Sequence, residues 1–167
     1  ASYSGSHPIT VETFESPSQV EKKKQGVVIG VGLFNLELSE IWWRIAGLDG
    51  ESKFVESRSD GPASVDRRIH LAGIWDGKEL RLYIDGVLQD DLASFVRSRA
   101  SGKGLVAIGN TRNRLHSPSF IGLIDEVRIS KIARYTEDFT PQERFDTDEH
   151  TMALYHFDEG SGDVLKD

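Results

Sequence analysis

Short runs in which apolar and polar residues alternate dominate this sequence. In residues 79–85, Leu80, Leu82 and Ile84 stand at every second position, with polar or aromatic side chains between them. This period of two is typical of a strand that buries one face. A second such run covers residues 68–76, and Asp-Gly pairs at 76–77 and 85–86 favour tight hairpin turns, because both residues accept positive φ. We therefore predict a meander of three strands over residues 68–90.

Further segments with strand composition lie on both sides of this meander, and turns rich in Gly, Asn, Asp, Pro and Ser separate most of them. They are residues 10–14, 27–34, 41–46, 53–57, 105–110, 120–130 and 152–158. The best helical segment is one turn at 141–145, with Thr140 as its cap and Pro141 as its first residue. Many strands and so little helix predict an all-β, two-sheet antiparallel jelly-roll sandwich with at most one or two short helical turns.

Length and composition narrow the functional classes. The 167 residues suit a single domain, 1–167, in which we expect residues 1–8 to be a linker. The net charge of −7 argues against a nucleic-acid partner, since such binding rests on Lys and Arg neutralising phosphates. No apolar run approaches the ~18 residues of a membrane span, so we expect no membrane insertion. The absence of cysteine excludes thiol catalysis, disulfides and thiolate zinc sites.

Three blocks of sequence resemble the laminin-G-like domains of the concanavalin A-like lectin and glucanase superfamily. They are HLAGIWDG (70–77) leading into LRLYIDG (80–86), AIGN (107–110) followed by FIGLIDEVRI (120–129), and ALYHFDEGSG (153–162). The resemblance covers residues 68–167 well and the first 60 residues only loosely, with Thr13-Phe14 in place of an aliphatic–Trp pair. It implies the jelly roll and favours an extracellular, periplasmic or cell-surface location. It does not imply a ligand, because the family includes sugar binders, protein binders and structural modules.

The position of the FDEGSG block departs from the family pattern. In the family this segment often opens a domain, whereas here it follows the block that normally ends one. The strand therefore either begins a second module or closes this sandwich. We favour closure, because a sandwich that lacks this strand would leave a ladder of unpaired backbone groups at its edge.

One carboxylate stands on a predicted apolar face. Alternation within 120–130 puts Asp125 on the same side as Leu123 and Val127, and a buried carboxylate must be paired, hydrogen-bonded or bound to a cation. The resemblance implies that this aspartate helps to hold one structural calcium ion, with Asp158 and Glu159 as further candidate ligands. The alternative is an aspartate held by backbone N–H groups, or turned outward by a β-bulge.

Two segments are candidates for ligand binding. Trp42 and Trp43 are neighbours in a predicted strand, so one indole points to the core and the other, beside Arg44, can form a platform on which a sugar stacks. The alternative is a second tryptophan covered by a loop. The loop 110–119 is rich in side chains that hydrogen-bond polyols or carboxylates, although it also fits a solvated connection. The candidate ligand residues are Trp42, Trp43, Arg44, Asn110, Arg112, Asn113 and His116.

Signals of catalysis are missing from the sequence. There is no Glu-x-Asp-x-x-Glu strand of the glucanase type and no Gly-x-Ser-x-Gly elbow, and Glu12 and Glu15 are spaced so that they face opposite sides of a strand. We therefore predict no enzyme but a recognition module, monomeric in isolation and excised from a larger multidomain protein. Carbohydrate is the favoured ligand. The alternative is a structural or protein–protein interaction module without a sugar ligand.

Overall fold

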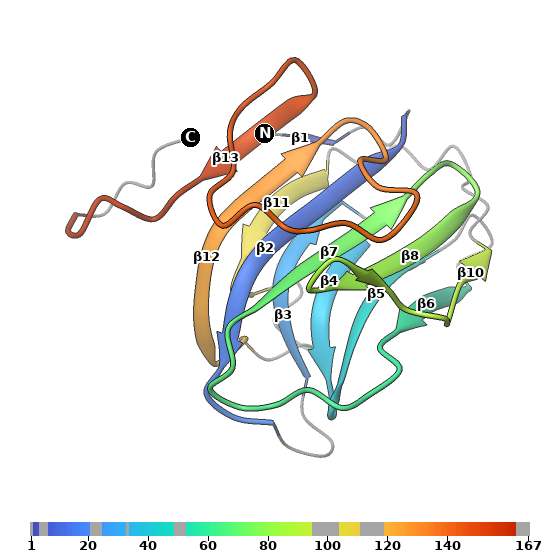
Figure 1. Ribbon diagram of the computed structural model, residues 1–167, viewed down its shortest axis with the longest axis horizontal. Helices are drawn as coiled ribbons and strands as arrows, with labels where there is room; N and C mark the ends of the chain where they lie inside the picture. The colour runs from blue at the N-terminus through green and yellow to red at the C-terminus, as the bar shows by residue number, and fades with distance from the viewer. Residues whose placement is uncertain are drawn as a thin grey trace.

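The computed structural model is a sandwich of two antiparallel β-sheets (Figure 1). It describes residues 2–3, 7–20, 25–32, 34–48, 53–94, 104–110 and 119–162. Within these ranges all regular structure is strand, and no helix suited to crossing a membrane occurs. The all-β, two-sheet prediction is confirmed.

The first sheet has six strands in the order β1-β11-β3-β4-β5-β6. Their bounds are Ser2–Tyr3 for β1, Gly104–Ile108 for β11, Gln25–Val31 for β3, Phe34–Ser39 for β4, Trp42–Leu48 for β5 and Phe54–Arg58 for β6. The second sheet has seven strands in the order β10-β8-β7-β2-β12-β13, with β9 paired to β8. Their bounds are Ala93–Ser94 for β10, Glu79–Ile84 for β8, Ile69–Trp75 for β7, Ile9–Pro17 for β2, Gly122–Ser130 for β12, Thr151–Tyr155 for β13 and Val87–Leu88 for β9.

The main core lies between the two sheets and is built from the alternating apolar residues of both. Leu80 and Leu82 are fully buried there, as the alternation predicts. The sheets approach so closely at Gly73 that a Cβ atom at this position would lie 2.8 Å from Cδ1 of Ile45. The absence of a side chain at residue 73 therefore lets the six-stranded sheet pack directly against β7.

Residues 131–150, which we call the covering segment, lie across the outer face of the seven-stranded sheet (Figure 1). Tyr135 and Phe139 of this segment pack on Tyr83, which is fully buried although it points away from the main core. The amide of Phe139 donates a 2.9 Å hydrogen bond to the carbonyl of Gly86. A Cβ at Gly86 would collide with the Phe139 carbonyl, so glycine is needed both for this contact and for its φ of 81°.

The predicted meander and the C-terminal closure are both confirmed. Strands β7, β8 and β9 pair in succession, and Asp85 and Gly86 both have positive φ, as a tight hairpin turn requires. Strand β13 pairs with β12, so the FDEGSG block leads out of a strand that belongs to this sandwich.

Two predictions about local structure are wrong. No helical turn forms at 141–145, because Phe145 is buried against Phe14 and Leu154, and its amide donates a hydrogen bond to the Glu126 carboxylate. The predicted strand 27–34 ends at Val31, which pairs with Phe34 across a reversal of the chain that opens the unpredicted strand β4. Gly32, with a φ of 62°, allows that reversal.

Asp125 is not buried; a β-bulge in β12 turns it outward, which is the alternative that the sequence left open. The register shifts between Asp125 and Arg128, and Glu126 has a positive φ of 52°. Before the bulge, Leu123 is 73% exposed, whereas Val127 after it is fully buried. The extra residue therefore reverses the alternation, as bulges do, and turns Asp125 outward. Ile121, two residues before Leu123, is exposed as well.

Candidate functional site

The two neighbouring tryptophans separate as the strand geometry predicts. Trp43 is 2% exposed and belongs to the main core, with its ring centroid 6.2 Å from that of Phe120. Trp43 therefore cannot reach a ligand and leaves the set of candidate ligand residues. Trp42 is half-buried, and together with Arg44 it lies on the outer face of the six-stranded sheet, because alternate residues of β5 point to opposite sides.

Arg44 is fixed between two carboxylates from the neighbouring strands. Its Nε donates to Oε1 of Glu37 on β4, and its Nη1 donates to Oε2 of Glu56 on β6, both at 2.6 Å. The pairing register places Arg44 directly opposite Glu37, which brings the two charges together. Burial raises the pKa of Glu37; the charge of Arg44 opposes this shift and that of Glu56 adds to it. The Arg44 guanidinium is thus held in one position by two carboxylates of the same chain.

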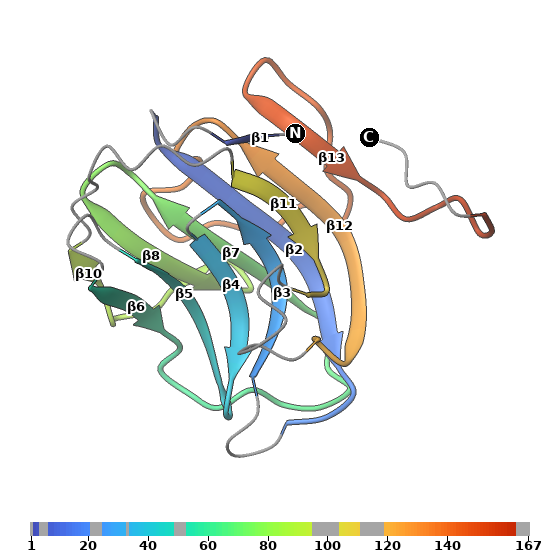
Figure 2. The same ribbon diagram turned by 180° about the vertical axis from the view of Figure 1, so that it is seen from behind.

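Phe54 adds an exposed aromatic ring to this face. It is 51% exposed, and the Arg44 guanidinium carbon lies 5.0 Å from its ring centroid. Phe54, Glu56 and Arg58 alternate along β6, so all three share the outer face. Figure 2 shows the sheet from this side, with β3, β4 and β5 nearest the viewer. We call Glu37, Trp42, Arg44, Phe54 and Glu56 the outer-face site.

The loop 110–119 begins and ends on the same sheet as this site. At its start, the amide of Gly109 donates to the carbonyl of Val28; at its end, Ser119 forms a bridge with Val27. Val27 pairs with Glu37, and Glu37 pairs with Arg44, so the loop rejoins the sheet in the cross-strand row that contains Arg44. Asn110 is exposed. Arg112, Asn113 and His116 lie outside the described residues, and their role stays a prediction.

The residues predicted to bind calcium do not form a set of ligands. The Asp125 side chain is 48% exposed and lies 3.6 Å from Arg68, while Asp158 pairs with Arg144 at 2.7 Å. In the described part of the chain, no three His, Asp or Glu side chains, Glu159 included, gather as a metal site would require. The side chains near Asp125 thus do not fit the ion, because Arg68 already brings a positive charge there. The calcium ion stays a prediction that metal titration can test.

The buried carboxylate of this region is Glu126, which the alternation did not indicate. Its Oε2 accepts the amide of Phe145 at 2.8 Å, and its Oε1 lies 2.8 Å from Nδ1 of His156. Glu126 therefore ties the covering segment and the chain after β13 to the bulge in β12. This arrangement explains the buried charge by protein partners alone.

Comparison with known proteins agrees with this geometry. The model of the family described as the concanavalin A-like lectin/glucanases superfamily matches residues 2–138. The chain therefore belongs to this superfamily of laminin-G-like β-sandwiches. A search of the curated proteins finds none that matches.

Solved structures with the same fold include proteins with different roles. A candidate carbohydrate-binding protein from Bacteroides ovatus is 18% identical with a TM-score of 0.75, covering 99% of this chain and 50% of its own. Domain 4 of AbnA, an extracellular arabinanase from Geobacillus stearothermophilus solved with arabinotriose, is 21% identical with a TM-score of 0.57, covering 76% of this chain and 62% of its own. Domains LG4-5 of the mouse laminin α1 chain are 14% identical with a TM-score of 0.58, covering 88% of this chain and 43% of their own. At these identities the likeness shows the fold alone, and the chain spans about half of the Bacteroides ovatus protein.

Proposed function

We propose that this chain is a carbohydrate-recognition module without catalytic activity, and that its sugar binds at the outer-face site. The observation that carries the proposal is the exposed ring of Phe54 beside a guanidinium that two carboxylates hold in place. The apolar face of a sugar ring packs on an aromatic side chain, and fixed charged groups donate to or accept from its hydroxyls. The family and the carbohydrate-binding relatives support the same ligand class.

The arrangement of the two carboxylates favours recognition over hydrolysis. A glycosidase places its acid and its nucleophile or base on either side of the scissile bond, with the sugar between them. Here the Arg44 guanidinium occupies the space between Glu37 and Glu56 and bonds to both. A sugar cannot take that place unless the arginine leaves it. We therefore expect no hydrolysis of any glycan that the protein binds.

The proposal predicts that Phe54→Ala weakens sugar binding by about tenfold or more, equivalent to about 1.4 kcal/mol. A glycan array with the purified protein would identify ligands, and isothermal titration of the best ligand would then compare wild type with the variant. Leu123→Ala is the matched control, because Leu123 is also exposed but lies on β12 of the other sheet. It should bind like wild type, and both variants should keep the wild-type circular dichroism spectrum.

Three results would contradict the proposal. If no glycan on the array binds the protein, the structural or protein-interaction alternative is favoured. If Phe54→Ala binds the sugar with unchanged affinity, the sugar site lies elsewhere on the molecule. Release of reducing sugar from a bound glycan would show that the protein is an enzyme.

A further inference from the structure

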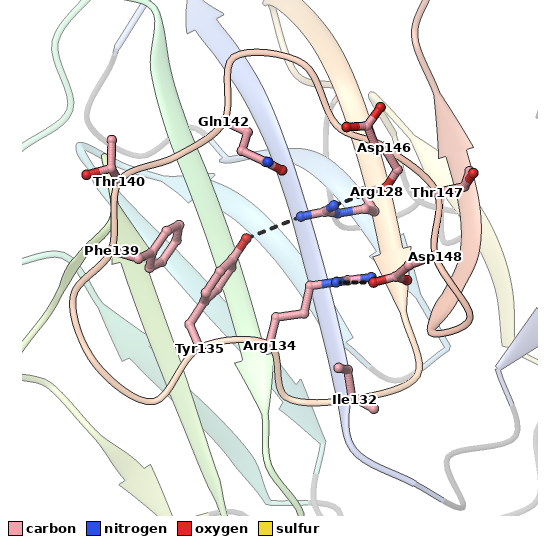
Figure 3. A pocket seen from close by; sticks show the side chains of 10 residues that line it. All are labelled: Arg128, Ile132, Arg134, Tyr135, Phe139, Thr140, Gln142, Asp146, Thr147 and Asp148. Atoms are coloured by element: carbon pink, nitrogen blue, oxygen red, sulfur yellow. Dashed lines mark hydrogen bonds and ion pairs between the residues drawn. The ribbon is translucent and has the colours of Figure 1, made fainter.

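A pocket lies on the opposite side of the sandwich from the outer-face site. The covering segment and the outer face of the seven-stranded sheet border an open pocket of about 470 Å³ (Figure 3). Arg128 of β12 forms part of its lining, and Arg134, Tyr135, Phe139 and Gln142 of the covering segment face it from other sides. Neither the alternation of the strands nor any motif pointed to this pocket, because the covering segment has no regular structure.

The charged side chains of the pocket are held rigidly. Arg128 donates from Nε to Glu12 at 2.9 Å and from Nη2 to the Tyr135 hydroxyl at 3.2 Å. Arg134 forms a two-point pair with Asp148, with distances of 2.9 and 2.7 Å. Groups already fixed in this way lose little conformational freedom when a ligand binds. The two guanidinium groups of the lining are therefore preformed, and protein acceptors already engage them.

The charge of this surface indicates which ligands it can select. Glu12 neutralises Arg128 and Asp148 neutralises Arg134, so neither guanidinium leaves an uncompensated positive charge in the pocket. The exposed carboxylate of Asp146 lines the same pocket and adds negative charge. An anionic ligand would therefore find no net attraction, whereas neutral hydroxyl groups can donate hydrogen bonds to the Asp146 carboxylate.

The covering segment supplies polar groups that the protein itself leaves available. The side chains of Gln142 and Thr140 are exposed and make no hydrogen bond to the residues that the structure describes. Figure 3 shows the Gln142 amide pointing into the pocket, towards Arg128. Beside it, Phe139 stacks on Tyr135 with ring centroids 3.5 Å apart, which gives the pocket one apolar wall. Amide, guanidinium and aromatic wall together match the polar edge and the apolar face of a sugar ring.

From these observations we infer that the pocket is a second carbohydrate site, which binds a neutral sugar ring and discriminates against acidic sugars. The Glu12–Arg128 ion pair beneath the pocket holds in place the guanidinium that forms part of its lining. The inference goes beyond the proposed function, because the two sites lie on different sheets and share no residue.

The test uses amide chemical shifts in two-dimensional NMR spectra of the full chain. The probes are glucose, galactose and arabinose at increasing concentration, with glucuronate and galacturonate as their acidic counterparts. We expect at least one neutral sugar to shift the amides of residues 134–147 in a saturable way, and its acidic counterpart to bind at least about tenfold more weakly. Gln142→Ala should weaken binding of the neutral sugar by about tenfold, which is the effect of losing one well-formed hydrogen bond.

Matched variants separate this inference from the proposed function. Glu143→Ala changes the next residue, which is exposed but does not line the pocket, and it should leave the sugar-induced shifts at 134–147 unchanged. Phe54→Ala should also leave these shifts unchanged. Sugar shifts confined to residues 42–58 would support the outer-face site and overturn the second site. Shifts at 134–147 that survive Gln142→Ala, or that an acidic sugar produces equally well, would also overturn it. Shifts at 134–147 alone would support the pocket while contradicting the outer-face site.

Discussion

Replacing Glu12 with alanine is expected to lower the free energy of unfolding by about 3–5 kcal/mol. The Glu12 carboxylate is fully buried under the covering segment, where it accepts hydrogen bonds from Arg128 at 2.9 Å and the Tyr135 hydroxyl at 2.9 Å, with His70 Nε2 at 3.2 Å. Without it, the Arg128 guanidinium would remain buried with no carboxylate beside it. Chemical denaturation monitored by tryptophan fluorescence measures this loss directly.

Two variants make the Glu12 prediction specific. Glu149→Ala removes a carboxylate that is 86% exposed and should change stability by less than about 0.5 kcal/mol. The double variant Glu12→Leu with Arg128→Met removes both charges and should recover much of the loss, because an apolar pair replaces the ion pair. A loss below about 1 kcal/mol in Glu12→Ala would show that Arg128 does not depend on this carboxylate.

The pKa of Glu12 gives the same network a pH dependence. Burial alone would raise this pKa, but the hydrogen bond from His70 and the nearby charge and hydrogen bond of Arg128 outweigh burial and hold it below its usual value. Because the pKa of Glu12 is lower in the folded protein than in the unfolded chain, ionised Glu12 stabilises the fold at pH values above the unfolded pKa. This stabilisation is then lost as pH falls through the folded value.

Glu15 is expected to make the protein less stable as pH rises, and Glu15→Gln should remove this effect. Glu15 faces the main core at 1% exposure, and neither carboxylate oxygen has a hydrogen-bond partner among the described residues. Burial, with a smaller contribution from the charge of Asp85, raises its pKa from 4.5 to about 9. The folded protein therefore keeps Glu15 protonated at neutral pH. Its contribution to stability is fully present below the unfolded pKa and declines as pH rises towards the folded value.

Unfolding experiments at two pH values measure the size of this effect. Between pH 5 and pH 7 the difference in pKa corresponds to a loss on the order of 3 kcal/mol in the wild type that Glu15→Gln should not show. Other titrating groups contribute equally to both proteins, so the difference between the two isolates Glu15. Parallel dependence on pH in the two proteins would mean that the Glu15 carboxyl has a partner or reaches water.

The sequence predicts the parts of this fold that depend on local pattern. Leu80, Leu82 and the two Asp-Gly turns place the meander correctly, because alternation and turn chemistry are properties of neighbouring residues. The bulge at Glu126 could be named only as an alternative, because it adds a single residue to the strand and no residue type in the sequence requires it. That single residue changed the predicted side of Asp125 and thereby the argument for calcium.

The candidate sites were predictable only in part. Trp42 and Arg44 could be chosen from the chain because strand alternation separates them from the core side chain of Trp43. Glu37 and Phe54 join them through strand pairing between distant segments, which the sequence does not reveal without the register. The pocket depends on where an irregular segment lies across a sheet, and Gln142 in that segment carries no pattern of its own.

The most direct test of sugar binding at the outer-face site is a crystal structure of the protein grown with the best ligand from the glycan array. We predict a sugar ring packed on the exposed face of Phe54, within about 4 Å, with hydroxyl groups hydrogen-bonded to Arg44 or Glu56. A bound sugar found only elsewhere, with nothing on Phe54, would contradict the proposed site.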